Sequence, residues 1–193
     1  MADKLNIQQR HQCMSRIRSK DTKPELLVRK GLHAQGFRFR LQDRRLPGKP
    51  DIVLAKYGVV IMVNGCFWHG HKGCRYATQP LSNVEFWDTK LAKNRHRDEV
   101  TTAHLEALGW TVIVVWECEL RGKEAAEIRI HALANEIRSA GEIKKQTDEL
   151  KRLYQFAAKR EKEQKLKRQA SLEEEIKRIY HIPKKVRYAS KEE

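Results

Sequence analysis

A nine-residue segment, Cys66-Phe67-Trp68-His69-Gly70-His71-Lys72-Gly73-Cys74, constrains the fold of this chain more than any other feature. It combines cysteine and histidine, which are ligands suited to Zn²⁺, with two adjacent bulky aromatic side chains. A structural zinc takes four ligands in a closed tetrahedron, and the segment supplies three candidates: Cys66, His71 and Cys74. The fourth candidate is Cys118, which follows a β-branched run typical of a buried strand. A metal bound by all four would tie the loop to the sheet.

The cysteines also have a simpler interpretation, as small apolar residues of a protein core. Disulfides are less expected, because the chain opens without an apolar signal segment and shows no other sign of secretion. We therefore expect reduced cysteines and a cytoplasmic location.

The net charge indicates the class of partner. The 193 residues include 40 Lys and Arg against 25 Asp and Glu, which gives a formal charge of +15. Such a surface attracts polyanions, and nucleic acid is the first expectation, through phosphate neutralisation and counterion release. An acidic membrane surface is the alternative partner. No run of about 18 apolar residues is present, so we expect nothing that spans a bilayer.

Composition divides the chain near Gly141. Residues 1–141 contain the apolar runs, whereas residues 142–193 are dominated by charge. Apolar residues of this tail are spaced for one helical face in two groups: Leu150, Leu153, Tyr154, Ala157 and Ala158, then Leu172, Ile176, Ile179 and Tyr180. The pattern predicts a charged helical tail over 142–193, either docked or oligomerising. A solvated helix that frays is the alternative.

The hydrophobic period changes along the first part in an order typical of a mixed α/β domain. Helices are expected over three ranges: 22–36, 84–108 and 124–139. Strands are expected over 37–41, 51–55, 59–63 and 111–116, with a hairpin turn at Lys56-Tyr57-Gly58. The last of these strands is rich in β-branched residues, which predicts a central position in the sheet.

Asp51 stands at the start of the second predicted strand, and the Cys66 segment follows the third. A carboxylate and a histidine can therefore converge at one edge of the sheet. The preceding run Leu46-Pro47-Gly48-Lys49-Pro50 makes a rigid approach to Asp51. A carboxylate is a hard oxygen ligand, which suits Mg²⁺. The alternative is an aspartate that caps a turn.

Five blocks of sequence together resemble a known family. They are Asp21-Thr22 with Glu25, Leu46-Pro47-Gly48-Lys49-Pro50-Asp51, Gly65-Cys66-Phe67-Trp68-His69, Glu85-Phe86-Trp87, and Gly109-Trp110 through Trp116-Glu117-Cys118. The same blocks occur in the same order in very short patch repair (Vsr) endonucleases, and the resemblance covers residues 8–140. It implies a restriction-endonuclease-like fold, in which a mixed sheet is flanked by helices. A Vsr-like nuclease domain over 21–141 would follow a basic arm over 1–20.

The resemblance also implies the activity: Mg²⁺-dependent nicking of double-stranded DNA 5′ to the thymine of a T·G mismatch, by a protein with a structural zinc. Asp51 would bind Mg²⁺ with the main chain of Val63, His69 would activate the attacking water, and Asp98 would orient His69. This agrees with the chemistry, because an imidazole is a competent base near neutral pH and a carboxylate on its other nitrogen fixes the tautomer.

Glu25 would hold a metal-bound water. Its alternative role is a capping box with Thr22, in which the glutamate accepts a main-chain N–H. The zinc ligands implied by the resemblance are Cys66, His71, Cys74 and Cys118, which leaves His69 free for catalysis.

Three aromatic residues, Phe67, Trp68 and Trp87, would enter the duplex beside the mismatch. Apolar wedges unstack base steps, at a lower cost where pairing is already faulty. The neighbouring Phe86 is expected in the core. The basic arm would close over the DNA, with Arg16 and Arg18 as contacts beside Arg10, His11 and Lys20; a solvated end is the alternative.

Two features depart from the family's pattern. Relatives often place a hydroxyl or an acid at position 63 or 64, where this chain has Val63 and Asn64, and this difference could weaken metal binding. The second departure is the tail, for which a repair protein is one candidate partner. We expect a monomeric nuclease domain in a bacterial, nucleoid-associated protein. The alternatives are a restriction- or defence-associated endonuclease of other specificity, and a zinc-stabilised DNA-binding protein with a decayed nuclease site.

Overall fold

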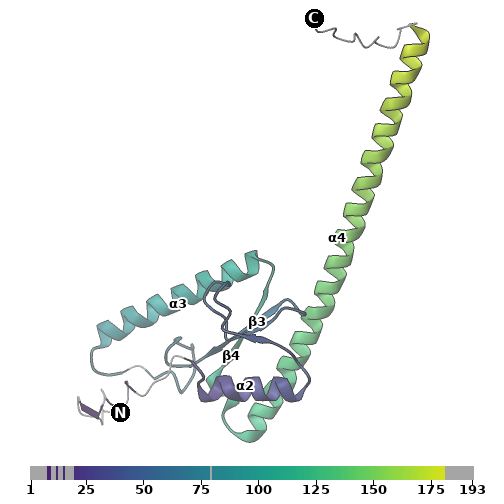
Figure 1. Ribbon diagram of the computed structural model, residues 1–193. Coiled ribbons are helices and arrows are strands. Elements are labelled where there is room, and N and C mark those ends of the chain that lie inside the picture. The colour runs from purple at the N-terminus through teal and green to yellow at the C-terminus, as the bar shows by residue number, and fades with distance from the viewer. Residues whose placement is uncertain (1–7, 10–11, 13–14, 16–19, 79, 181–193) are drawn as a thin grey trace, which may run out of the picture. The chain divides into compact units, whose positions relative to one another are not determined.

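The computed structural model describes residues 8–9, 12, 15, 20–78 and 80–180. The chain forms two compact units, residues 1–144 and 145–193. The described elements are α2 (Lys23–Ala34), β1 (Arg40–Leu41), β2 (Ile52–Leu54), β3 (Val59–Asn64), α3 (Val84–Ala107), β4 (Thr111–Trp116), the 3₁₀ turn η1 (Glu117–Leu120) and α4 (Lys123–Ile179) (Figure 1). The arm residues Arg10, His11, Arg16 and Arg18 lie outside the described residues.

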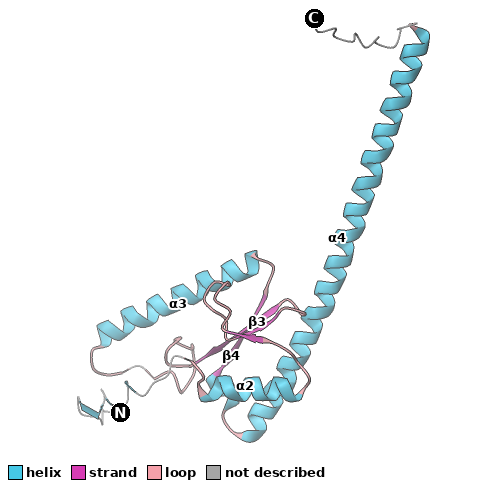
Figure 2. Cartoon of the chain, viewed as in Figure 1, coloured by secondary structure: helices cyan, strands magenta, loops and turns pink. Residues whose placement is uncertain are grey.

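Four short strands of the first unit form a mixed sheet in the order β1-β2-β3-β4 (Figure 2). The first two pairings are antiparallel, and β3 pairs with β4 in parallel. Leu54 pairs with Val59 across the predicted hairpin turn. The parallel pair runs in register up to Asn64 opposite Trp116, so both strands end at the same edge of the sheet. A parallel connection needs a long crossover, and α3 lies within it.

The position of β4 differs from the prediction. It lies at one end of the sheet among the described strands rather than at its centre. Only Val115 of this strand is buried, and its other residues are partly or fully exposed. A β-branched run indicates a strand packed on one or both faces, but it does not report how many strands lie beside it.

The two faces of the sheet build two apolar clusters. Residues alternate between the faces along each strand, as the pleat requires. One face of the sheet packs against α2 and the first part of α4. The buried residues of this cluster include Val28, Leu32, Ile52, Leu54, Val59, Ile61, Val115, Leu133 and Ile137. The other face carries Val53 and Val60, which pack with Leu105 of α3. Figure 1 shows α3 on one side of the sheet and α2 on the other.

The start of α2 shows why a helix forms where the sequence predicts one. The Thr22 hydroxyl caps the helix by accepting from the main-chain N–H of Glu25, and Pro24 lies in the first turn. Gly36, just beyond the helix, has a φ of +84°, which is favourable for glycine. This helix positions Glu25 and Arg29 on its buried side.

The predicted end of the last helix near Ser139 is wrong. Helix α4 continues without a break from Lys123 to Ile179, and Gly141 lies inside it. The glycine is required by a close approach, because a Cβ at this position would lie 2.6 Å from Cδ1 of Tyr57. The Tyr57 ring in turn packs edge-to-face on Phe37, with ring centroids 5.3 Å apart. The division of the chain into arm, nuclease domain and tail stays a prediction.

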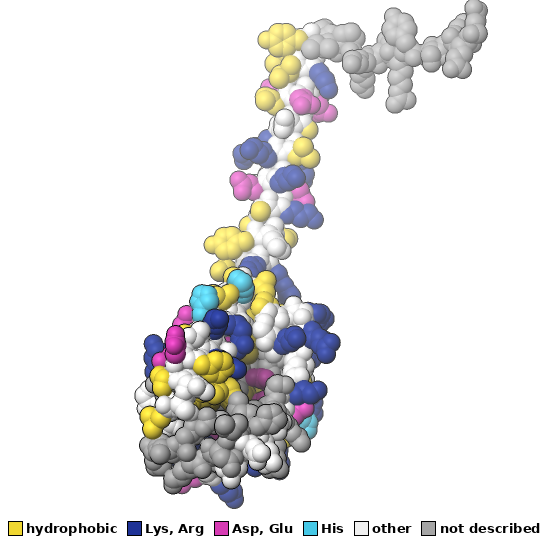
Figure 3. Space-filling model, turned by 90° about the vertical axis from the view of Figure 1, so that its left-hand side faces the viewer, with side chains coloured by type: hydrophobic (Ala, Val, Ile, Leu, Met, Phe, Trp, Pro, Cys, Tyr) yellow, Lys and Arg dark blue, Asp and Glu magenta, His cyan; other side chains and the backbone are white. Residues whose placement is uncertain are grey.

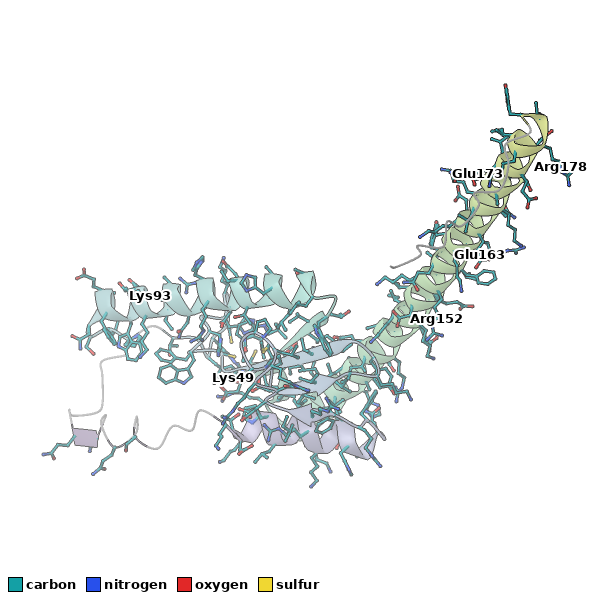
Figure 4. All side chains as sticks on the ribbon, turned by 45° about the horizontal axis from the view of Figure 1, so that its top comes forward. Lys49, Lys93, Arg152, Glu163, Glu173 and Arg178 are labelled. Atoms are coloured by element: carbon teal, nitrogen blue, oxygen red, sulfur yellow. The ribbon has the colours of Figure 1, made fainter. Side chains whose placement is uncertain are left out.

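Residues 145–179 of the second unit are helical, and the side chains of residues 145–180 are all exposed. Figure 4 shows Arg152, Glu163, Glu173 and Arg178 projecting from this part of α4. None of the described helices is long and apolar enough to cross a membrane.

We expect Gly141→Val to lower the free energy of unfolding by about 1–3 kcal/mol, because the new side chain overlaps the Tyr57 ring. Urea denaturation monitored by circular dichroism measures this cost. The same substitution in a Tyr57→Ala background, where the added methyl groups have room, should cost less. Equal costs in the two backgrounds would contradict the steric explanation.

Candidate functional site

A cleft of about 1180 Å³ opens on the first unit. Four of the predicted site residues line it together: Glu25, Asp51, His69 and Asp98. Five basic side chains also border it: Lys20, Lys23, Arg44, Lys49 and Arg97. Figure 4 labels Lys49, beside the sheet. The cleft exceeds the volume of about 300–1,000 Å³ that is usual for small-molecule sites. Its size and basic border fit a large polyanionic substrate.

The loop before β2 holds Asp51 in place. Gly48 has a φ of +67°, and a Cβ there would lie 2.2 Å from Cγ2 of Thr101 on α3. The glycine therefore lets the loop lie against α3. Asp51 follows this loop, and its Oδ2 accepts a hydrogen bond from the main-chain N–H of Val63, at 2.8 Å. The carboxylate is thus attached to the neighbouring strand β3.

The electrostatic environment of Asp51 disfavours its negative charge. Burial raises the pKa of Asp51 to about 6, and the Val63 N–H opposes this shift. The nearby Glu25 carboxylate raises the pKa further, whereas Arg29 and His69 lower it. A bound cation is a partner that would stabilise the ionised form.

His69 is held by α3. Its Nδ1 lies 2.5 Å from Oδ2 of Asp98, a geometry that fits an Nδ1–H donating to the carboxylate. One turn earlier on the same helix, Nδ2 of Asn94 donates to the main-chain oxygen of Trp68, at 2.9 Å. Residues four apart lie on one helix face, so α3 fixes two consecutive residues of the segment.

Sequence reasoning missed Asn94 as a positioning residue. The spacing from Asn94 to Asp98 was the available signal, because a residue four positions from the expected partner of His69 faces the same loop. Glu117 was also missed. It lines the cleft, just beyond the end of β4.

The Glu25 carboxylate is buried and accepts three hydrogen bonds. The donors are the Asp21 main-chain N–H at 3.0 Å, the Thr22 hydroxyl at 2.9 Å and Nη2 of Arg29 at 2.8 Å. The geometry is close to a capping box, except that the main-chain donor is Asp21 rather than the capping residue Thr22. Glu25 nevertheless lines the cleft, so both roles considered from the sequence remain compatible with its position.

The predicted zinc ligands lie together at the edge of the sheet. One ligand atom from each of Cys66, His71, Cys74 and Cys118 falls within 4.8 Å of the others. The register of β3 and β4 explains this, because Cys66 and Cys118 each follow the last paired residue by two positions. The His71 ring also stacks on Trp116, with centroids 4.0 Å apart.

The donor set fits a thiophilic cation. Sγ of Cys118 lies 3.4 Å from Nδ1 of His71, close to the separation of about 3.5 Å that a tetrahedral zinc imposes on a thiolate and an imidazole. Burial and the neighbouring cysteines raise the pKa of Cys118 to about 12. A cation would allow thiolates to persist in this environment.

The aromatic residues of the segment form a cluster with the start of α3. Phe67 lies 5.0 Å from Trp68 and 5.2 Å from Trp87, measured between ring centroids. The expectation that Phe86 lies in the core is wrong: its side chain is 56% exposed and packs edge-to-face on Trp87. Because α3 buries few residues, an aromatic side chain near its start adds an exposed member to this half-buried cluster instead.

The site is that of a hydrolytic nuclease of the metal-dependent class: a partly buried carboxylate and a histidine–carboxylate pair share a basic cleft beside a Cys₃His cluster. Comparison with known proteins supports the same class. The family model for the DNA mismatch endonuclease Vsr matches residues 2–75. The type II nicking enzyme V.NmeAIP of Neisseria meningitidis is 49% identical over 140 residues, which are 72% of this chain and 99% of that enzyme.

Two further relatives support the same conclusion. The type II nicking enzyme V.XorIIP of Xanthomonas oryzae is 48% identical over 67% of this chain and 95% of its own length. The DNA mismatch endonuclease Vsr of Escherichia coli is 44% identical over 64% of this chain and 79% of its own length. The chain belongs to the Vsr family of DNA mismatch endonucleases. It is therefore a DNA-nicking endonuclease of mismatch repair, and the family implies a divalent metal.

We expect Asp51→Asn to stabilise the protein at neutral pH. The pKa of Asp51 is raised from its ordinary 3.8 to about 6, so the stability that its protonated form contributes is present below pH 3.8 and lost as the pH rises through 6. The free energy of unfolding of the Asn variant should be higher than that of the parent by about 1–3 kcal/mol above pH 6, and the difference should be small in acid. Urea denaturation across this pH range, without added Mg²⁺, measures the difference.

Asp43→Asn is the matched control of opposite sign. The Arg45 guanidinium and main-chain N–H donate to Asp43 and hold the pKa of that carboxyl below its usual range. The ionised Asp43 carboxylate therefore contributes to the free energy of unfolding above its unfolded pKa. The Asn variant should be less stable than the parent at neutral pH, and this loss should disappear in acid. If both variants differed from the parent in the same direction at neutral pH, the assigned environment of Asp51 would be contradicted.

Proposed function

We propose that this chain uses Mg²⁺ to nick one strand of double-stranded DNA at a T·G mismatch, and thereby initiates very short patch repair. The observation that carries the proposal is the convergence of Asp51 with the His69–Asp98 pair in one basic cleft. The finer parts of the proposal are the identity of the metals, the role of each residue and the choice of mismatch.

His69 is the proposed base. With Nδ1–H donating to Asp98, Nε2 is the nitrogen that accepts a proton from the attacking water. The water oxygen forms a bond to phosphorus as the bond from phosphorus to the leaving oxygen breaks. Asp98 stabilises the imidazolium that forms through the hydrogen bond between its carboxylate and Nδ1.

Asp51 and the main-chain oxygen of Val63 are the proposed Mg²⁺ ligands. Both residues line the cleft, and the raised pKa of Asp51 supports a cationic partner for its carboxylate. When bound, Mg²⁺ supplies charge that stabilises the phosphate as negative charge develops in the transition state. Glu25 is proposed to hold a metal-bound water, which its anchored carboxylate can do from the same cleft.

Zinc is the proposed occupant of the Cys₃His cluster. Three thiols and one imidazole form a closed set of four ligands, which is typical of a structural zinc and leaves no position for a reacting water. The metal would hold the loop against the sheet, and so keep His69 in reach of Asp98.

The half-buried aromatic cluster supports the proposed preference for a mismatch. Phe67, Trp68 and Trp87 are positioned together, and Trp68 also lines the cleft. Inserting such side chains unstacks base pairs, and this costs less where the pairing is already faulty. Arg16 and Arg18, outside the described residues, are proposed to contact the DNA backbone from the arm.

A restriction- or defence-associated nickase with another specificity is the second candidate. Its support is that several relatives, V.NmeAIP and V.XorIIP among them, are named type II nicking enzymes. The two candidates share the same chemistry and differ in the bases that flank or form the site.

The two histidines of the segment separate catalysis from metal binding. His69→Ala should reduce the single-turnover nicking rate by about 10²–10⁴-fold, with its zinc content and melting temperature unchanged. His71→Ala should lose zinc and melt at a lower temperature, because one of four ligands is missing. Elemental analysis and thermal melting, beside the nicking assay, measure both variants. A His71→Ala protein with a full zinc content would exclude the proposed ligand set.

Nicking of labelled duplexes tests the substrate. We expect cuts on the thymine strand of a T·G duplex in Mg²⁺, none in EDTA, and none in the fully paired control. Varied flanking sequences and other mismatches complete the panel. Metal-dependent cutting of a paired sequence in preference to T·G would favour the second candidate, and Asp51→Ala should be inactive on every duplex.

A further inference from the structure

The helical part of the second unit exposes large apolar side chains. Leu150 and Leu153 are 53% and 59% exposed, and Ile179 is 65% exposed. In Figure 3, hydrophobic side chains occur near both ends of this part of α4, with charged side chains between them. Exposed groups of large apolar side chains mark an interaction surface, and a helix this polar normally needs a packed face to be stable.

The apolar side chains share one face of the helix. Leu150 and Leu172 are 22 residues apart, with Glu161 midway between them. Steps of eleven residues are close to three helical turns, so all three lie on one face. The same step separates Ala157, Arg168 and Ile179. The face defined by these positions, which we call the stripe, is apolar at both ends and charged in the middle.

A second copy in antiparallel orientation complements this stripe. With the two-fold axis between Gln164 and Lys165, each residue of one copy faces a residue equally far from the axis in the other. The pairs are then Leu150 with Ile179, Leu153 with Ile176, Ala157 with Leu172, and Glu161 with Arg168. In these four pairs apolar residues meet apolar residues and Glu161 meets Arg168, while Glu175, on the same face, lies opposite Tyr154.

A parallel arrangement lacks this complementarity. Each charged residue of the stripe would then face its own copy, Glu161 against Glu161 and Arg168 against Arg168, and such like-charge contacts are unfavourable. In the antiparallel arrangement the pair of Glu161 with Arg168 forms twice, once on each side of the axis. The two-fold symmetry limits the assembly to two chains.

We propose that residues 150–179 form an antiparallel helical interface with a second copy of this chain. The stripe is about 44 Å long at 1.5 Å per residue. It lies beyond the part of the chain that matches the Vsr family model. The match to V.NmeAIP covers 99% of that enzyme but 72% of this chain, so more than a quarter of the chain has no counterpart there. The proposal is independent of the chemistry in the cleft.

A charge exchange across the axis tests the orientation. In the full-length protein, Glu161→Arg and Arg168→Glu should each weaken dimerisation about tenfold at low salt, because both symmetric pairs become repulsive. The double variant restores attraction in both pairs and should dimerise like the parent. Sedimentation equilibrium measures the dissociation constants. An equimolar mixture of the two single variants should form a heterodimer with two attractive pairs.

Two leucines provide a matched pair for the apolar part. Leu153 is on the stripe, whereas Leu166 is 69% exposed and lies on the opposite side of the helix. Leu153→Ala should weaken dimerisation on the order of tenfold to a hundredfold, since each dimer loses two buried side chains. Leu166→Ala should have little effect. Circular dichroism of both variants checks that the helix is retained.

Several results would overturn the proposal. One is a parent chain that stays monomeric over the whole concentration range; another is a dimer that responds equally to both leucine substitutions. Failure of the double charge variant to recover would exclude the antiparallel pairing. If Leu153→Ala instead weakens DNA binding by a monomeric chain, the stripe contacts DNA. Nicking is measured on the same variants, so an inactive parent would count against the proposed function alone.

Discussion

The parallel pairing of β3 with β4 is the interaction on which the site depends. The register that places Asn64 opposite Trp116 brings both strands to the same edge of the sheet, and Cys66 and Cys118 follow at equal distances. The four candidate metal ligands meet there without a contribution from α2 or α3. The same strand β3 offers the Val63 N–H to Asp51. A shift of one residue in this register would reverse the facing of every side chain along β4, and would separate Cys118 from the loop.

The segment after β3 is fixed from two directions, which lets two histidines that are two positions apart contact different partners. Cys66 and His71 belong to the cluster at the sheet edge, whereas His69 and the Trp68 carbonyl are bound by Asp98 and Asn94 of α3. A loop that was attached on one side only would leave the His69 ring free to rotate. Because the segment is attached both at the sheet edge and to α3, the tautomer and position of the His69 imidazole are set before the substrate binds.

The sequence predicted the parts of the fold that depend on local chemistry. Capping at Thr22, the hairpin turn near Tyr57 and the metal-ligand spacing around Cys66 all follow from residue type and spacing, and all appear in the structure. The errors concern partners that are distant in sequence. Gly141 looked like a helix end because its Tyr57 contact is 84 residues away. Phe86 looked like core because an aromatic residue gives no sign of which way its helix faces. The support that Asn94 gives to the loop also depends on how α3 packs.

The balance of charge in the cleft gives Asp51 a special position among its acidic residues. Glu25 is paired with Arg29, and Asp98 lies between His69 and Arg97. Asp51 accepts a main-chain N–H instead, and its raised pKa records a negative charge that burial leaves poorly compensated. At positions 63 and 64 the chain offers valine and asparagine, with neither a carboxylate nor a hydroxyl, so a cation at the proposed site would rest on Asp51 and on main-chain oxygen. Such a site would hold Mg²⁺ more firmly once the phosphate of the substrate supplied further oxygen ligands, because Mg²⁺ needs six oxygen ligands in a near-ideal octahedron.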